Sequence, residues 1–227
     1  MSNKNWKYIS YRSIWGGLDL IFPPFCGGCR KPGPRGCEDC QKKVQIFNGI
    51  VCDVCGLPQN KAGVCDLCFA DRPHFRALRA WAIFDDRLRS ASHKLKSRRD
   101  LSLGDSLAAQ MISFVPALNW PINVIVPIPP GKRRLKDRGY NQGGMIAAPL
   151  TMALDVHYFP NGLMRRTETP SQVGLTKQEC KENVRDAFAA HAGLKGKNVL
   201  VMEDVSTTGS TLSSSADALF LSGAKEV

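Results

Sequence analysis

Two hydrophobic patterns alternate along residues 75–227 of this chain. Mostly apolar runs predict strands at 77–84, 122–126 and 199–202, and a run without polar alternation is typical of a strand buried on both faces. Helical patterns separate these runs, at 87–98, 103–118, 145–154, 177–188 and 212–221. Strands that alternate with helices predict an α/β fold, in which helices flank a parallel sheet.

Weaker signals fill the intervals. Residues 155–159 predict a short strand, and the polar stretch Arg165–Gln172 has the length and composition of a mobile loop. Asp85 or Asp86 precedes the helix predicted at 87–98 and is a suitable N-cap. The composition changes near residues 71–73, so we predict a small module at 18–70 and an α/β domain at 75–227.

Cysteines dominate the N-terminal module. Cys180 stands alone, and the other eight cysteines form four C-x-x-C pairs: Cys26/Cys29, Cys37/Cys40, Cys52/Cys55 and Cys65/Cys68. Two intervening residues let both thiolates reach one ion, and Zn²⁺ prefers four such ligands in a tetrahedron. We therefore predict two structural Zn²⁺ ions. Consecutive pairing gives two zinc ribbons, an interleaved pairing stays open, and buried or redox-active cysteines are the alternative.

So small a module lacks an adequate apolar core, and metal binding would supply much of its folding free energy. Zinc ribbons dock on nucleic acids or on proteins. Nearby basic residues favour nucleic acid mildly, namely Lys31, Arg35, Lys42 and Lys43.

Charge points to a polyanionic partner. The 227 residues carry a formal net charge of +11, which raises the expectation of nucleic-acid binding without bearing on the fold. The helix predicted at 87–98 and its flank concentrate basic side chains, either as a phosphate-binding surface or as an ordinary solvated face: Arg87, Arg89, His93, Lys94, Lys96, Arg98 and Arg99. We expect single-stranded DNA as a partner.

The N-terminal residues lack the pattern of a signal peptide, because Asp19 interrupts the short apolar run 18–22. No uninterrupted apolar run is long enough to span a bilayer. C-x-x-C pairs in a chain of this kind fit a reducing compartment. We expect a cytoplasmic protein, one that could lie at the inner face of the membrane.

The most informative stretch is 199–211. An apolar strand ends at two carboxylates, Glu203 and Asp204, and a loop of small hydroxyl residues then leads into a helix. Unpaired backbone N–H groups at a helix N-terminus bind anions, and hydroxyl groups and a glycine assist there: Thr207, Thr208, Gly209, Ser210 and Thr211. Carboxylates accept hydrogen bonds from a diol, so a phosphorylated ribose fits the stretch.

Two alternatives bear on this interpretation. An ordinary strand-to-helix turn with a Thr or Ser cap has a similar composition. A nucleotide triphosphatase is disfavoured, because no P-loop lysine follows Gly209.

A second anion site is predicted after the strand at 122–126. Residues 127–142 form a proline-stiffened segment rich in basic residues, at the carboxyl end of a strand of the same sheet. Its basic side chains suit a pyrophosphate, although a plain basic surface loop is the alternative: Lys132, Arg133, Arg134 and Arg138.

The stretch 199–211 resembles the phosphoribosyl pyrophosphate motif of type I phosphoribosyltransferases, with its apolar strand, two acids and T-G-x-T loop. The resemblance implies that fold for the second domain. It also implies that Glu203 and Asp204 hold the ribose hydroxyls, that 207–211 hold the 5′-phosphate, and that Mg²⁺ accompanies the pyrophosphate.

The whole pattern is more specific. Paired zinc knuckles, Leu95-Lys96, the V-P-I-P of 126–129, the R-G-Y-N-Q of 138–142, and finally Gln172, Asn183 and the ribose-phosphate motif resemble the ComF/GntX family. This resemblance implies an accessory protein of natural competence that binds single-stranded DNA and a phosphoribosyl pyrophosphate-like ligand. The alternatives are an active phosphoribosyltransferase whose acceptor the sequence does not identify and a docking platform without chemistry.

The chain departs from the family pattern in two places. Cys180 stands where an arginine is usual, and Val227 comes where such a sheet continues into another strand. Two interpretations stay open: a shortened protein, or a sheet that has lost its last strand.

Overall fold

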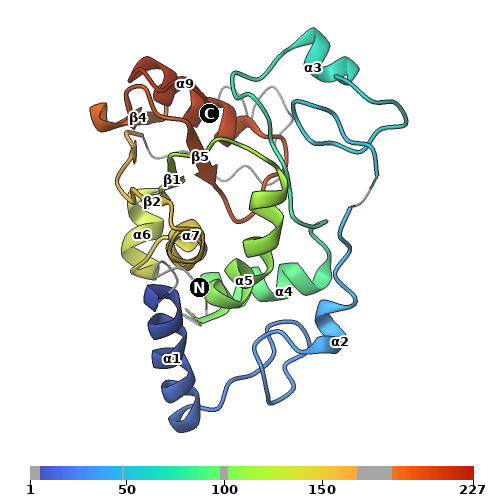
Figure 1. Cartoon of the computed structure of the whole chain (residues 1–227), viewed down its shortest axis with the longest axis vertical. Coiled ribbons are helices and arrows are strands. Elements are labelled where there is room, and N and C mark those ends of the chain that lie inside the picture. Colours follow the sequence, from blue (N-terminus) through green and yellow to red (C-terminus); the bar gives the residue numbers. More distant parts are fainter. Residues whose placement is uncertain (1–5, 48, 98–101, 168–185) are drawn as a thin grey trace.

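A computed structural model describes residues 6–47, 49–97, 102–167 and 186–227 (Figure 1). Its centre is a parallel sheet in which β1 (Val124–Pro127) lies between β2 (His157–Tyr158) and β5 (Val199–Met202). Val124 is level with both His157 and Val199, and the β1–β5 ladder extends to Pro127 and Met202. The expected mixed α/β fold with a parallel sheet is confirmed.

The sheet divides the core into two layers because side chains alternate along a strand. Val124 and Val126 of β1 pack with Leu194 and Leu219 on one face. Ile125 points to the other face, where it packs with residues of three helices, namely Leu95, Leu103 and Leu150. Every residue of β1 is buried, as its unbroken apolar run predicts.

Helices α4 (Asp86–Ser97), α5 (Ser102–Ala117) and α7 (Gln142–Leu154) cover the second face. Asp85 caps α4, since its Oδ1 accepts hydrogen bonds from the N–H groups of Arg87 (3.1 Å) and Leu88 (3.0 Å). Helices α5 and α7 approach closely at Gly104, where a Cβ atom would lie 2.7 Å from the carbonyl oxygen of Met145. On the other face lies α9 (Ser210–Leu221), which follows β5 directly.

An antiparallel pair, β3 (Leu163–Arg165) with β4 (Phe188–Ala190), and the short 3₁₀ turn η2 (Ala192–Leu194) complete this part. The sequence did not predict the pair. Phe188 was expected to end a helix that began at Lys177, whereas it begins a strand. Residues 177–185 of that helix, including Cys180 and Asn183, and residues 168–172 of the expected loop lie outside the described residues.

The segment 77–84 is not the strand that its composition predicted. Its backbone groups pair with the N-terminal module instead of the sheet: the N–H of Leu78 donates to the carbonyl of Val54 (2.7 Å), and that of Ile83 to Gln45 (2.9 Å). Apolar composition therefore reflects contact with the module here, not membership of the sheet.

Residues 132–138 form the short helix α6 (Lys132–Arg138), where a loop was expected. It ends at Gly139, whose φ of 86° places it in the left-handed region that favours glycine. After α9 the chain turns back, and Glu226 forms a parallel bridge with Asn198 beside β5.

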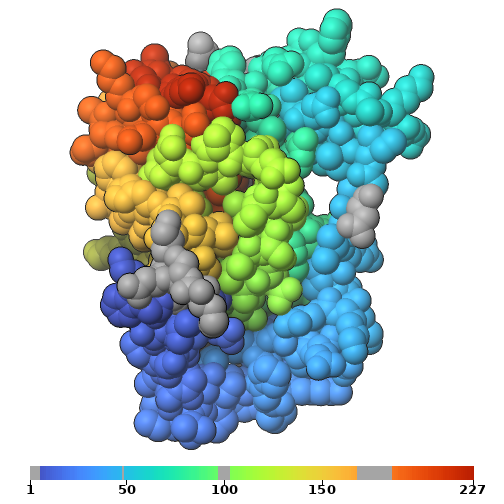
Figure 2. Space-filling model, in the orientation of Figure 1, coloured from blue at the N-terminus to red at the C-terminus, as the bar shows by residue number. Residues whose placement is uncertain are grey.

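An N-terminal helix, α1 (Trp6–Ile21), went unpredicted because Gly16, Gly17 and Asp19 interrupt its pattern. It is tied to the ribbon module by Asp19, whose two carboxylate oxygens each lie 2.5 Å from the Arg35 guanidinium. No described helix combines the length and apolar character needed to cross a membrane. Figure 2 shows that residues up to about 70 run along one whole side of the molecule.

Candidate functional site

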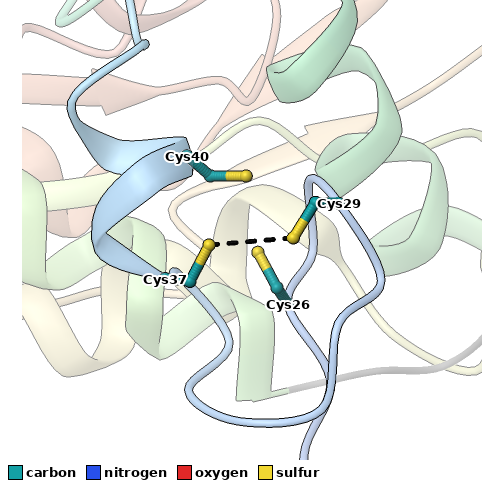
Figure 3. A group of neighbouring side chains, drawn as sticks. All are labelled: Cys26, Cys29, Cys37 and Cys40. Atoms are coloured by element: carbon teal, nitrogen blue, oxygen red, sulfur yellow. Dashed lines mark hydrogen bonds between the residues drawn. The ribbon is translucent and has the colours of Figure 1, made fainter.

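The eight paired cysteines form two separate clusters. Cys26, Cys29, Cys37 and Cys40 make the first, drawn in Figure 3, and Cys52, Cys55, Cys65 and Cys68 make the second. Pairing is thus consecutive, and the interleaved alternative is wrong. Within each cluster all sulfur atoms lie within 4.8 Å of one another, and none of the eight cysteines is in a disulfide.

The sulfur spacing fits tetrahedral zinc. With Zn–S bonds of about 2.3 Å, the edge of a regular tetrahedron of sulfurs is about 3.8 Å. Cys29 and Cys37 have their sulfur atoms 3.7 Å apart, and so do Cys55 and Cys65 (Figure 3). Both sites therefore suit a structural Zn²⁺ ion held by four thiolates.

The two ribbons repeat one backbone turn. The N–H of Cys26 donates to Lys31 and its carbonyl accepts from Arg30, while Cys52 bonds in the same way to Leu57 and Gly56. Arg30 and Gly56 both have positive φ, 66° and 69°. At this turn position the second ribbon requires a glycine for space, since a Cβ at Gly56 would lie 2.5 Å from the carbonyl oxygen of Leu78.

Backbone N–H groups prepare one thiolate in each ribbon. Burial raises the pKa of Cys26, but hydrogen bonds from the backbone of Cys37, Cys29 and Gly28 outweigh it and lower the pKa to about 6. Cys52 has the same environment and also a pKa of about 6. Burial and the neighbouring thiols raise the pKa of Cys40 to about 12, so metal binding must displace its proton.

The two carboxylates lie at the carboxyl end of β5, as predicted. Asp204 is held at one oxygen: its Oδ2 accepts from the Ser92 hydroxyl at 3.1 Å and lies 2.7 Å from Nζ of Lys96, and both partners belong to α4. Among the described residues, Oδ1 of Asp204 has no hydrogen-bonding partner and can accept one from a ligand.

Glu203 differs from its neighbour in charge. Burial and the negative charge of Asp204 raise the pKa of Glu203 to about 8, although Lys96 and Arg165 act in the opposite direction. At neutral pH this carboxyl group is mostly protonated and can donate a hydrogen bond, whereas a carboxylate can only accept. The acid pair thus offers both roles to a diol.

The loop after the acid pair presents hydroxyl groups to solvent. Ser206, Thr207 and Thr208 are exposed, and the Thr208 hydroxyl lies 2.8 Å from that of Ser210. Gly209 takes the N-cap position with a φ of 74°, and no side chain caps α9. The Ser210 N–H donates to the Thr208 hydroxyl at 3.4 Å, and the exposed hydroxyls before α9 lie at the positive end of the helix dipole, where an anion is stabilised.

A cavity of about 1340 Å³ extends from the acid pair and this loop toward the second ribbon. Its opposite walls are largely apolar and include Trp81, Phe84 and Trp120. The residues of α6 do not line it; Lys132, Arg133 and Arg134 are exposed on the surface instead, and Arg138 is half-buried. The predicted pyrophosphate residues are therefore not part of the lining of this cavity, and their role stays a prediction.

Two lysines of α4 are not the solvated surface that the sequence suggested. Lys94 is 8% exposed and Lys96 is paired with Asp204. Sequence reasoning missed Ser92 and the pairing of Lys96, although the Ser92–Lys96 spacing of four residues places both on one face of a helix. Arg98 and Arg99 lie outside the described residues.

Comparisons with known proteins agree with the ribbon geometry, and similarity to three relatives covers most of the chain. The family model of the double zinc ribbon domain matches residues 17–69. The DNA utilization protein YhgH of Escherichia coli is 28% identical over 219 residues, which cover 92% of this chain and 96% of that protein.

Two competence proteins are also similar. Competence protein ComFC of Bacillus subtilis is 27% identical over 201 residues, 85% of this chain and 81% of that protein. Competence protein F of Haemophilus influenzae is 26% identical over 201 residues, 84% of this chain and 86% of that protein.

Proposed function

From the premise that this chain is a homologue of the ComF-type competence proteins, we propose that it is an accessory protein of DNA uptake. In this proposal it binds single-stranded DNA on exposed basic residues and a phosphoribosyl pyrophosphate-like ligand at the acid pair. The names of the relatives concern competence and DNA utilization, and they support a role in DNA uptake. The ligand rests on the geometry of this chain.

One observation supports the ligand above all others. Ser92 and Lys96 both bind Oδ2 of Asp204, so the carboxylate is fixed while Oδ1 is left available. The protonated Glu203 beside it can donate, and the uncapped N-terminus of α9 begins six residues after Asp204 with exposed hydroxyls before it. A ribose with two adjacent hydroxyls and a 5′-phosphate matches this order of groups.

Support for single-stranded DNA comes from charge. The chain carries a net charge of +11, and α6 exposes Lys132, Arg133, Arg134 and Lys136 on one short helix. Because these side chains lie outside the cavity of the acid pair, a polyanion can reach them without competing for that cavity. We therefore assign α6 to DNA and not to the pyrophosphate of the small ligand.

Calorimetry on zinc-loaded protein tests both parts. We expect phosphoribosyl pyrophosphate with Mg²⁺ to bind with a stoichiometry near one, and a single-stranded oligonucleotide to bind without displacing it. Folded protein that binds neither ligand would contradict the proposal. Binding of the small ligand without binding of the oligonucleotide would contradict its DNA-binding part.

An active phosphoribosyltransferase is the second candidate, because the cavity beyond the acid pair has room and apolar walls for an acceptor. When bound with the ligand, Mg²⁺ would supply the charge that neutralises the leaving pyrophosphate, and of the acid pair the carboxylate of Asp204 suits its preference for oxygen ligands. Release of pyrophosphate in the presence of candidate aromatic acceptors would favour this candidate. Binding without release favours the accessory protein.

A further inference from the structure

Helix α4 lies between the first zinc ribbon and the acid pair, and it contacts both with the same kinds of group. Toward the ribbon, the Ser90 hydroxyl donates to the carbonyl of Gly27 at 3.2 Å, and Lys94 Nζ donates to the carbonyls of Gly27 (2.7 Å) and Cys26 (3.0 Å). Toward the acid pair, Ser92 and Lys96 bind Asp204. Helix α4 therefore connects the first zinc ribbon to the candidate ligand site.

Lys94 makes the ribbon contact specific. Burying an ammonium group is costly unless it is paired and hydrogen-bonded, and Lys94 finds two carbonyl oxygens in the knuckle. One carbonyl belongs to Cys26, a member of the first cysteine cluster. Four thiolates around one Zn²⁺ carry a net negative charge, so the loaded ribbon also favours a cation beside it.

The turn at Gly27 in the first ribbon packs tightly against α4. A Cβ at Gly27 would lie 3.3 Å from Cβ of Ala91 on α4 and 2.7 Å from a methyl group of Leu103 on α5. The knuckle backbone thus sits directly on the two helices. If the ribbon loses its fold, Lys94 and Ser90 lose their acceptors and α4 loses a face of its packing.

We propose that Lys94 is a positioning residue, through which the zinc-loaded first ribbon fixes α4 so that Ser92 and Lys96 hold Asp204 ready for the phosphorylated ribose. The inference rests on the proposed function of the acid pair. In this proposal, binding of zinc in the first ribbon favours binding of ligand at the acid pair, and the reverse also holds. Such coupling is reciprocal: zinc raises the affinity for ligand, and ligand slows the loss of zinc.

Lys94→Met tests this coupling, because methionine keeps the apolar stem and removes the ammonium group. In the wild type, phosphoribosyl pyrophosphate with Mg²⁺ should slow zinc release to a chelator at least about fivefold in one kinetic phase. In Lys94→Met that slowing should disappear, and affinity for the ligand should fall about tenfold. Lys61→Met, at an exposed lysine of the second ribbon, is the matched control and should change neither quantity.

The outcomes separate this inference from the proposed function. If the wild type binds the ligand and Lys94→Met, with both zinc ions retained, binds it equally well, the inference is wrong while the site stands. If Lys94→Met does not retain both zinc ions, Ser90→Ala, which removes a single hydrogen bond to Gly27, carries the same test.

An unfolding measurement without ligand tests the coupling even if the proposed function is wrong. Lys94 joins α4 to the first ribbon, and Asp204 contacts the same helix through Ser92 and Lys96. Lys94→Met and Asp204→Asn should therefore have non-additive effects on the urea midpoint of unfolding. Additive effects would overturn the coupling, whether or not any ligand binds.

Discussion

Lys96 places its ammonium group 2.7 Å from Oδ2 of Asp204, joining a helix from the first half of the chain to the end of the last strand of the sheet. The contact is half-buried and reinforced by the Ser92 hydroxyl on the same oxygen. Together they determine which carboxylate oxygen remains for a ligand.

Lys96→Met should weaken binding of phosphoribosyl pyrophosphate by about ten- to a hundredfold, because a charge-assisted hydrogen bond contributes about 1.5–3 kcal/mol and Asp204 loses its fixed orientation. Ser92→Ala, which removes one neutral donor, should have a smaller effect. Calorimetry on both variants measures the difference. Equal affinities for the wild type and Lys96→Met would show that the ion pair does not orient the site.

The raised pKa of Glu203 predicts how the stability of the protein depends on pH. Its pKa is raised from the ordinary 4.5 to about 8, so the folded state holds a proton that the unfolded state releases. The stabilising effect of this proton is complete below pH 4.5 and is lost as pH rises to about 8. Glu203→Gln cannot ionise, so its stability relative to the wild type should increase across that window and level off above it.

Thermal unfolding of the wild type and Glu203→Gln at a series of pH values checks this. Glu203→Asp is not a suitable control, because it keeps the titrating group. A constant difference in melting temperature at all pH values would mean that Glu203 titrates normally.

The two ribbons should bind zinc independently. Protein purified without added metal should contain about two equivalents of zinc, one for each set of four thiolates. Cys29→Ser should reduce the content to about one equivalent, since its sulfur belongs only to the first cluster. Elemental analysis measures both. Loss of both ions from Cys29→Ser would show that the ribbons fold as one unit.

DNA binding should depend on salt and on α6. Replacing Lys132, Arg133, Arg134 and Lys136 together by Ala should weaken binding of all single-stranded sequences alike, because phosphate contacts carry no sequence information. Wild-type affinity should fall at least about tenfold between about 50 and 200 mM salt, and the variant should show a shallower slope. Fluorescence anisotropy measures both.

The same variant separates two roles for α6. Weaker binding of phosphoribosyl pyrophosphate with unchanged DNA affinity would show that these residues bind the pyrophosphate group and not DNA. Replacement of four exposed lysines elsewhere, at Lys61, Lys195, Lys197 and Lys225, is the charge-matched control for a general effect of net charge.

Local patterns in the sequence predict those features whose cause is local. Unbroken apolar runs predict β1 and β5; β1 is buried along its whole length, and β5 is buried at its first and last residues. C-x-x-C spacing predicts the thiolate clusters, since two intervening residues already place both sulfurs near one ion. The place of the acid pair and its loop, at the carboxyl end of the sheet, is predicted because they directly follow a strand.

Features set by distant contacts are not visible in the sequence. Lys94 resembles a surface lysine until the carbonyls of Cys26 and Gly27, 68 and 67 residues away, are placed beside it. Residues 77–84 have the composition of a strand, but the carbonyl of Val54 takes the N–H of Leu78. Likewise, α1 is a helix despite Gly16 and Gly17, and the buried Tyr8 and the ion pair of Asp19 anchor it to the rest of the protein. The domain boundaries at 18–70 and 75–227 stay a prediction.

The central claim is that the acid pair and the loop before α9 bind a phosphorylated ribose. Calorimetry of zinc-loaded wild type, Asp204→Asn and Thr208→Val with phosphoribosyl pyrophosphate plus Mg²⁺, and with ribose 5-phosphate, tests it most directly. We predict that the wild type binds both ligands, that Thr208→Val weakens both alike, and that Asp204→Asn lowers Mg²⁺-dependent affinity for phosphoribosyl pyrophosphate by about ten- to a hundredfold. Folded wild-type protein that binds neither ligand, or an Asp204→Asn variant that binds as tightly as the wild type, would contradict the claim.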